Sequence, residues 1–207
     1  MQSSSFVSVE SARTQSAPVG VTVIIDGANG SGKTVRGELM STWTGFDFFD
    51  TGAELRKMKE QGLLPEEVVR CMSECGYVPD SFISRLLRDR AYKDPMRSKI
   101  YVGVRTAEQI HDLILNVYNF RHRIIHIRLH RKKEECLKLA QMRGREDADP
   151  KGFDIRWGLY QEHSASIQSF LNSRPAIRQI SYRLTDEIEP DAVAILKLIE
   201  PHCPNIS

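Results

Sequence analysis

The stretch Val21-Thr22-Val23-Ile24-Ile25-Asp26-Gly27-Ala28-Asn29-Gly30-Ser31-Gly32-Lys33-Thr34 decides the fold of this chain. Its first five residues form a short apolar, β-branched run, which is typical of a strand buried on both faces. The residues from Gly27 to Thr34 match the pattern G-x-x-x-x-G-K-[ST] in full. A strand, a glycine-rich turn and a helix beginning at Lys33 are therefore predicted in that order.

This loop pattern predicts a phosphate-binding site. Its glycines allow a tight turn whose backbone N–H groups converge on phosphate oxygens, next to the positive end of the following helix. The Lys33 ammonium suits β- and γ-phosphates, and the Thr34 hydroxyl suits Mg²⁺, which prefers oxygen ligands. A match of this length arises by composition alone in about one chain per hundred or fewer. We therefore predict that ATP and Mg²⁺ bind here, with Thr34 as the metal ligand. The predicted ATP-binding residues are Gly27, Asn29, Gly30, Ser31, Gly32, Lys33, Thr34 and Val35.

Strand and helix patterns alternate along the rest of the chain. Strands are predicted at 21–25, 46–49, 99–104, 123–129 and 179–184. Helices are predicted at 33–41, 53–61, 66–74, 81–92, 107–120, 132–142, 154–171 and 190–199, with Asp80 and Thr106 as caps and Gly37 as a weak point in the first. Such alternation implies parallel pairing through right-handed crossovers. The predicted fold is α/β, a three-layer P-loop sandwich with a central parallel five-stranded sheet.

Length and charge limit the classes of protein that remain. A chain of 207 residues suits one domain, which we place at 21–200 behind a disordered tail at 1–20 that lacks a secretory apolar stretch. The formal net charge of +2 gives no reason to expect nucleic acid as a partner, and no apolar run approaches the roughly 20 residues of a membrane span. The four cysteines and six histidines show no metal-site spacing. We expect a cytoplasmic monomer with reduced thiols and no membrane partner.

Five further motifs follow the loop. They are Asp50-Thr51-Gly52-Ala53-Glu54-Leu55-Arg56, Gly76-Tyr77-Val78-Pro79-Asp80, Arg105-Thr106-Ala107-Glu108-Gln109, Arg143-Gly144-Arg145-Glu146-Asp147 and Arg156-Trp157-Gly158-Leu159-Tyr160. With them, the chain from Val21 to about Leu198 resembles the adenylate-kinase-like nucleoside monophosphate kinases. The first three motifs are similar to the family's T-G-x-x-L-R, G-x-V-P-D and R-T-x-x-Q segments. The last two are similar to a short lid and the helix start behind it.

The resemblance implies a reaction and a role for each matched residue. The implied reaction transfers the ATP γ-phosphate to a nucleoside monophosphate, with AMP favoured. The implied acceptor-binding residues are Thr51, Gly52, Arg56, Arg105 and Gln109, of which the arginines bind the acceptor phosphate and Gln109 reads adenine. An acceptor-binding insert at about 50–95 and a short lid at about 143–155 complete the arrangement. The implied catalytic residues are Lys33, Arg105, Arg143, Arg145 and Arg156, whose charged side chains surround the transferred phosphate.

Departures from the family leave alternatives open. The family's strand-end aspartate, which organises the Mg²⁺ shell, is replaced by Tyr101 or, with a one-residue gap, by Val102. Asp26 or Asp50 can supply a carboxylate from a neighbouring strand end instead. The G-x-R form at 103–105 is also similar to the dephospho-coenzyme-A kinases, which take a larger acceptor. A weakly active, nucleotide-binding regulatory module is the third alternative.

Overall fold

One parallel sheet forms the centre of the computed structural model, which describes residues 20–144 and 149–203. Its strands are β1 (Gly20–Gly27), β2 (Asp47–Asp50), β3 (Lys99–Val102), β4 (His122–His130) and β5 (Arg178–Arg183). The strand order is β2-β3-β1-β4-β5, and all four pairings are parallel. The α/β fold and the parallel five-stranded sheet predicted from the sequence are confirmed.

Strand β1 is the middle of the sheet, because β3 pairs with one side of it and β4 with the other. Every residue of β1 is buried, as its β-branched run predicts. The carboxyl ends of parallel strands meet at one edge of a sheet, so the glycine-rich loop after β1 lies between the ends of β3 and β4, and the end of β2 follows on the far side of β3. At that edge Asp50 is in register with Val102.

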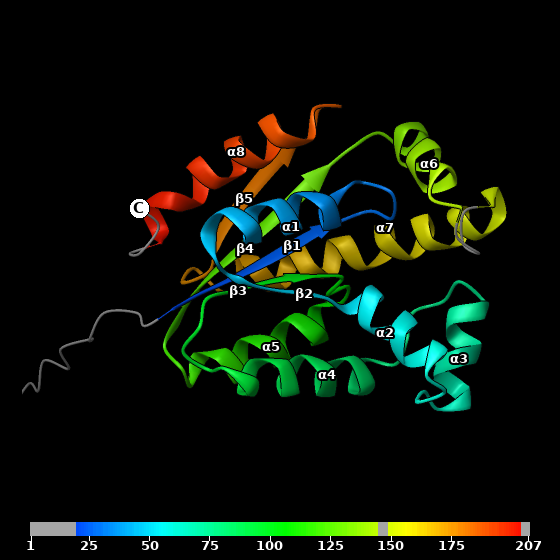
Figure 1. Ribbon diagram of the computed structural model, residues 1–207, viewed down its shortest axis with the longest axis horizontal. Coiled ribbons are helices and arrows are strands. Elements are labelled where there is room, and N and C mark those ends of the chain that lie inside the picture. The colour runs from blue at the N-terminus through cyan, green and yellow to red at the C-terminus, as the bar shows by residue number, and fades with distance from the viewer. Residues whose placement is uncertain (1–19, 145–148, 204–207) are drawn as a thin grey trace, which may run out of the picture.

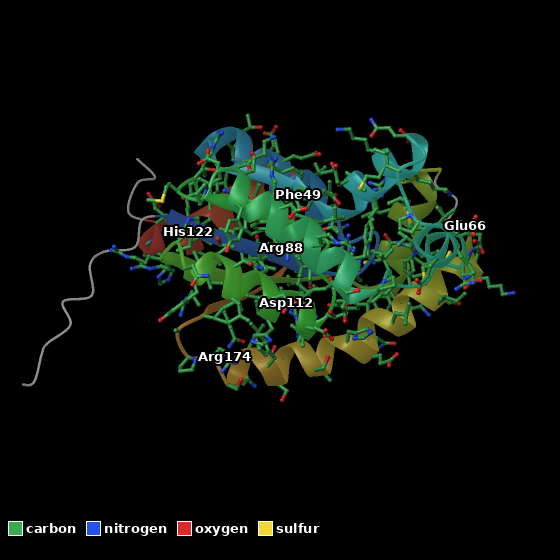
Figure 2. The ribbon with its side chains drawn as sticks, turned by 90° about the horizontal axis from the view of Figure 1, so that it is seen from below. Phe49, Glu66, Arg88, Asp112, His122 and Arg174 are labelled. Atoms are coloured by element: carbon green, nitrogen blue, oxygen red, sulfur yellow. The ribbon has the colours of Figure 1, made fainter. Side chains whose placement is uncertain are left out.

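Helices cover both faces of the sheet and complete three layers (Figure 1). One face packs against α1 (Lys33–Thr44) and α8 (Ile188–Ile199), which is followed by the short helix η2 (Glu200–His202). The other face packs against α4 (Asp80–Lys93), α5 (Ala107–Tyr118) and α7 (Pro150–Asn172). Figure 2 views this second layer from outside, with Arg88 marking α4 and Asp112 marking α5.

Gly37 lies inside α1 because the helix packs very closely on the sheet. A Cβ added there would lie 2.8 Å from Phe48 Cε2 and 3.2 Å from Val102 Cγ2. The sequence identifies Gly37 only as a weak point of the helix, whereas the tertiary contact explains why glycine is required.

Three helices lie at the carboxyl edge of the sheet instead of over its faces (Figure 1). Helices α2 (Thr51–Glu60) and α3 (Glu66–Ser73) follow β2 and fall within the predicted acceptor-binding insert. Helix α6 (Lys133–Met142) follows β4, and its Cys136 and Ala140 pack with Ala28 of the glycine-rich loop and Phe153 of α7. The loop is therefore held between the sheet and two helices.

Asp80 does not cap α4, so that prediction is wrong. Pro79 occupies the N-cap position and Asp80 is the first helical residue. Asp80 Oδ1 instead accepts hydrogen bonds from Thr106 Oγ1 at 2.8 Å and from Gln109 Nε2 at 2.7 Å. Thr106 caps α5 as predicted, because its Oγ1 also accepts a hydrogen bond from Gln109 N at 3.1 Å.

Some predicted elements have other boundaries in the structure, and some predicted segments lie outside the described residues. Helix α7 begins at Pro150 with Asp149 as its cap, earlier than the predicted start at Asp154, and β3 ends at Val102. The predicted tail lies outside the described residues except for Gly20, and so do Arg145 and the lid segment 145–148. Within the described ranges, no helix has the length and apolar character to cross a membrane.

Candidate active site

The glycine-rich loop is shaped by a close approach to α6. Gly30 has a φ of 77°, and a Cβ at that position would lie 2.1 Å from the Cys136 carbonyl oxygen. Only glycine fits both the left-handed backbone and this contact. Ser31 Oγ is buried and has no hydrogen-bond partner among the described residues. Such a hydroxyl is available to a ligand that enters the loop.

Lys33, at the start of α1, points back into the loop. Its Nζ donates a hydrogen bond to the Ala28 carbonyl oxygen at 2.9 Å. Burial lowers the pKa of Lys33 to about 8, and the positive charges of Arg105 and Arg143 act in the same direction while Asp50 and Asp26 oppose them. The loop, the segment after β3 and the end of α6 thus concentrate positive charge around one ammonium group.

Asp50 supplies the carboxylate beside Thr34. Thr34 Oγ1 donates a hydrogen bond to Asp50 Oδ2 at 2.8 Å, while Asp50 Oδ1 caps α2 by accepting from Ala53 N at 3.0 Å. Val102, one of the two positions at which the aspartate is missing, pairs with Asp50 in register. Tyr101, the other position, is fully buried in the opposite core cluster. The carboxylate therefore lies one strand away from the position that the family pattern predicts.

Asp26, the other candidate carboxylate, is used within the fold. Its Oδ1 accepts a hydrogen bond from Gly27 N at 2.7 Å, and its Oδ2 accepts from Arg128 Nε at 3.1 Å. His126 Nε2 lies 4.0 Å from the same Oδ2, and burial lowers the pKa of His126 to about 4. Of the two alternatives, the structure favours Asp50 as the partner of Thr34.

The oxygen atoms at this edge suit Mg²⁺. Mg²⁺ is bound in proteins through one or two oxygen side chains plus substrate phosphates and water. The Thr34 hydroxyl and the Asp50 carboxylate provide such a pair beside the phosphate-binding loop. Groups of three or more His, Cys, Asp or Glu side chains that could hold another kind of metal ion are absent from the described residues.

A cavity of about 550 Å³ opens between the sheet edge, α2, α3 and α7. Six of the predicted site residues line it: Thr51, Gly52, Arg56, Arg105, Gln109 and Arg156. The structure thus gathers residues that are up to 105 positions apart in the sequence around a single cavity.

The walls of this cavity differ in chemistry. Arg56, Lys59, Arg105 and Arg156 contribute positive charge, whereas Glu60 is the lining carboxylate. Another part is apolar and consists of Leu55, Met72, Val78 and Ile83. Such a combination suits a ligand that carries both an anionic group and an apolar group.

Thr51 lies where α2 meets the sheet. Its Oγ1 is buried and has no hydrogen-bond partner among the residues described. A Cβ added at Gly103 would lie 3.3 Å from Thr51 Cβ, so the ends of β2 and β3 are in close contact there. Such a buried, unpaired hydroxyl on a cavity wall is available to a polar atom of a ligand, and the predicted contact of Thr51 with an acceptor stays a prediction.

Gln109 lines the same cavity but also forms contacts within the fold. Its Oε1 accepts a hydrogen bond from Arg105 N at 2.8 Å, and its Nε2 donates to Asp80 Oδ1 at 2.7 Å. Gln109 therefore fixes the backbone at Arg105. One amide hydrogen and one lone pair remain for a ligand, so its predicted recognition of adenine stays a prediction.

The arginines of the predicted lid are only partly described. Arg156 of α7 lines the cavity, and Arg143, at the end of α6, is close enough to lower the pKa of Lys33. Arg145 lies outside the described residues.

The sequence prediction missed Tyr77, Lys59 and Glu60 as cavity residues. Tyr77 belongs to a quoted motif, but at a position that the motif leaves free. Lys59 and Glu60 lie beyond the end of the quoted α2 motif, and we find no sequence signal that would have identified them.

The fold and the loop define this chain as an α/β protein with the P-loop kinase-like architecture. It resembles a solved structure described as a gluconokinase from Sinorhizobium meliloti 1021, with 17% identity and a TM-score of 0.61. The match covers 92% of this chain and 97% of the gluconokinase chain. No protein-family model and no curated protein sequence matches the chain.

Proposed function

We propose that this protein is an ATP-dependent phosphotransferase whose acceptor is a nucleoside monophosphate, with AMP as the first candidate. The observation that carries the proposal is the cavity at the sheet edge, which is lined by both arginines and apolar side chains. The P-loop kinase-like fold supports transfer of phosphate to a small molecule.

The donor nucleotide is assigned to the loop after β1. Backbone N–H groups from 27–34 and the Lys33 ammonium bind the ATP phosphates, and Ser31 Oγ offers a further polar contact. Thr34 and Asp50 are the residues that would hold Mg²⁺. When bound, the ion neutralises negative charge that develops on the transferred phosphate.

The acceptor is assigned to the cavity. Arg56 and Arg105 fit an acceptor phosphate, since arginine forks bind phosphate through two parallel hydrogen bonds. The apolar wall formed by Leu55, Val78 and Ile83 suits a nucleobase better than the hydroxyl groups of a sugar acid. This wall is the reason for preferring a nucleotide over gluconate.

Catalysis then depends on positioning and charge. Thr51 of the cavity follows Asp50, which accepts a hydrogen bond from Thr34. Arg105 of the cavity also lies close enough to Lys33 to lower its pKa, so donor and acceptor phosphates can lie in line. Lys33, Arg105 and Arg156 surround the transferred group and stabilise its charge. A general base is not required of the protein, because phosphoryl transfer needs little covalent chemistry from it.

A panel of acceptors tests this proposal. The purified protein is incubated with ATP and Mg²⁺ together with each common nucleoside monophosphate, gluconate or dephospho-coenzyme A, and products are followed by ³¹P NMR. We expect diphosphate formation with AMP, and none with Lys33→Met. Turnover of gluconate or dephospho-coenzyme A alone would replace the proposed acceptor, and ATP binding without any turnover would favour the regulatory alternative.

A further inference from the structure

Tyr77, in the turn between α3 and α4, has contacts that the proposed phosphotransfer does not explain. Its ring stacks on His163 of α7, with ring centroids 5.2 Å apart and planes 23° apart. The Arg105 guanidinium carbon lies 5.2 Å from the centroid of the same ring. One aromatic ring therefore joins the helical insert, α7 and the segment that follows β3.

The turn that carries Tyr77 lies along one face of α7. Gly152, Arg156 and His163 are separated by four and seven residues, a spacing that places them on one face of a helix. A Cβ added at Gly152 would lie 2.9 Å from Cys75 Sγ, so this face touches the turn at two places. Both figures are consistent with this contact, because α3 and the first half of α7 lie at the same end of the molecule in each view (Figures 1 and 2).

The backbone of the turn is held in an unusual conformation. Cys75 has a φ of 57°, which residues other than glycine seldom adopt. Cys75 ends α3 in this way, because Gly76 N donates a hydrogen bond to the Cys71 carbonyl oxygen at 2.8 Å and Cys75 N donates to the Met72 carbonyl oxygen at 3.3 Å. The turn that this helix end begins then contacts α7 through Cys75 at Gly152 and through Tyr77 at His163.

Arg105 needs a group that keeps it over the cavity. Arg105 and Lys33 repel each other, and this repulsion contributes to the lowered pKa of Lys33. The face of the Tyr77 ring attracts a guanidinium through its quadrupole. Burial raises the pKa of Tyr77, while the neighbouring Arg105 acts in the opposite direction.

We propose that Tyr77 is a positioning residue, which holds Arg105 over the cavity and, through His163, ties the helical insert to α7. When the insert docks on α7, Arg105 is therefore placed over the cavity at the same time. This inference rests on the proposed phosphotransfer, in which Arg105 binds the acceptor phosphate. His163 acts through Tyr77 and not on the substrate.

Variants that remove the ring or only its hydroxyl separate these roles. Tyr77→Leu and His163→Leu each break the stack, whereas Tyr77→Phe keeps the ring and loses the hydroxyl. Phe170→Leu is a matched control, because Phe170 has the same two kinds of neighbour. Its ring centroid lies 5.7 Å from that of His111 and 5.3 Å from the Arg174 guanidinium carbon. None of these three residues lines the cavity. Each variant is assayed for kcat and for the KM of acceptor and of ATP, and its thermal midpoint is measured.

We expect Tyr77→Leu to raise the acceptor KM about tenfold, because this factor matches the free energy lost with a partly buried cation–π contact. The KM for ATP should stay within about twofold of wild type. His163→Leu should raise the same KM by less, and Tyr77→Phe should restore most of the affinity. Kinetics of Tyr77→Leu that match those of Phe170→Leu, or an equal rise in the ATP KM, would overturn the role of Tyr77.

Measurements on the wild-type protein distinguish failure of the proposed function from failure of the positioning role of Tyr77. If no acceptor is turned over, the proposed function fails, and the role of Tyr77 is tested by calorimetric titration with AMP. Weaker AMP binding by Tyr77→Leu than by Phe170→Leu then supports the positioning role. Equal binding by these two variants, or no binding of AMP by the wild type, overturns it.

Discussion

Lys33 carries a charge that depends on pH near neutrality, because burial and nearby cations lower its pKa to about 8. Phosphate groups beside the ammonium raise that pKa again, so ATP binding above pH 8 takes up a proton. We expect ATP affinity to be constant near pH 7.5 and to fall, by up to about tenfold per pH unit, as the pH rises through the free pKa. Isothermal titration between about pH 7.5 and 9.5 measures this.

Lys33→Arg is the control, since arginine keeps its charge over this range. Its ATP affinity should be lower than wild type but independent of pH. A wild-type affinity that does not change across the same range would contradict the assignment of Lys33 to the phosphates.

Asp50 provides a second prediction at the residue scale. Asp50→Asn keeps a good N-cap for α2 but removes the charge beside Thr34, so stability should change little. The rate should fall about 10- to 100-fold, which is the usual loss when a group that organises a metal site is replaced. The Mg²⁺ concentration that gives half of the maximal rate should also be higher for Asp50→Asn than for the wild type.

Val102→Asp is the informative companion. It restores the family's strand-end carboxylate, but Val102 is 1% exposed and in register with Asp50. Two neighbouring carboxylates repel, so we expect a lower thermal midpoint and no gain in rate. A large gain in rate would show that Asp50 does not replace the missing aspartate.

At the scale of elements, a buried ion pair joins α1 to α8. Arg36 Nη2 and Asp191 Oδ2 are 2.5 Å apart, with side chains 2% and 1% exposed. Asp191 also accepts hydrogen bonds from Thr185 N and from Tyr182 Oη, while Arg36 Nη1 donates to the Gly32 carbonyl oxygen at 3.4 Å. The pair therefore holds the phosphate-binding loop to the segment after β5.

Removing one partner leaves a buried charge without compensation. We expect Asp191→Ala to lower the free energy of unfolding by about 3–5 kcal/mol in urea denaturation. Asp89→Ala is the control, because the Arg88–Asp89 pair is 55% and 65% exposed and such pairs contribute about 0–1 kcal/mol. Similar losses for both variants would contradict the stabilising role of the Arg36–Asp191 pair.

Elements and motifs could be predicted from local sequence, whereas contacts between them could not. The β-branched run at 21–25 and the loop after it predict β1 and α1 because their signals are local. The local pattern predicts Asp80 as a cap, and this fails because its actual partners, Thr106 and Gln109, lie 26 and 29 residues away. Asp26 and Asp50 were equivalent in sequence, and only the strand register brings Asp50 to Thr34.

For the whole molecule, the strand order explains where the candidate site lies. Strands β2, β3 and β1 are neighbours, so Asp50, the segment after Val102 and the phosphate-binding loop meet at one edge of the sheet. Helices α2 and α3 enclose the cavity from one side and α7 from another. The proposed donor and acceptor sites are therefore adjacent through topology, and this adjacency is the basis of the proposed transfer.

Transfer of labelled phosphate in a single turnover tests this claim most directly. Protein in excess over ATP labelled at the γ-phosphate is mixed with Mg²⁺ and AMP, and the labelled products are separated over time. We predict that the label appears in ADP formed from AMP in the wild type, that it does so much more slowly in Arg105→Met, and that it stays in ATP in Lys33→Met. Release of the label as inorganic phosphate, or its retention in ATP in the wild type, would contradict phosphotransfer to AMP.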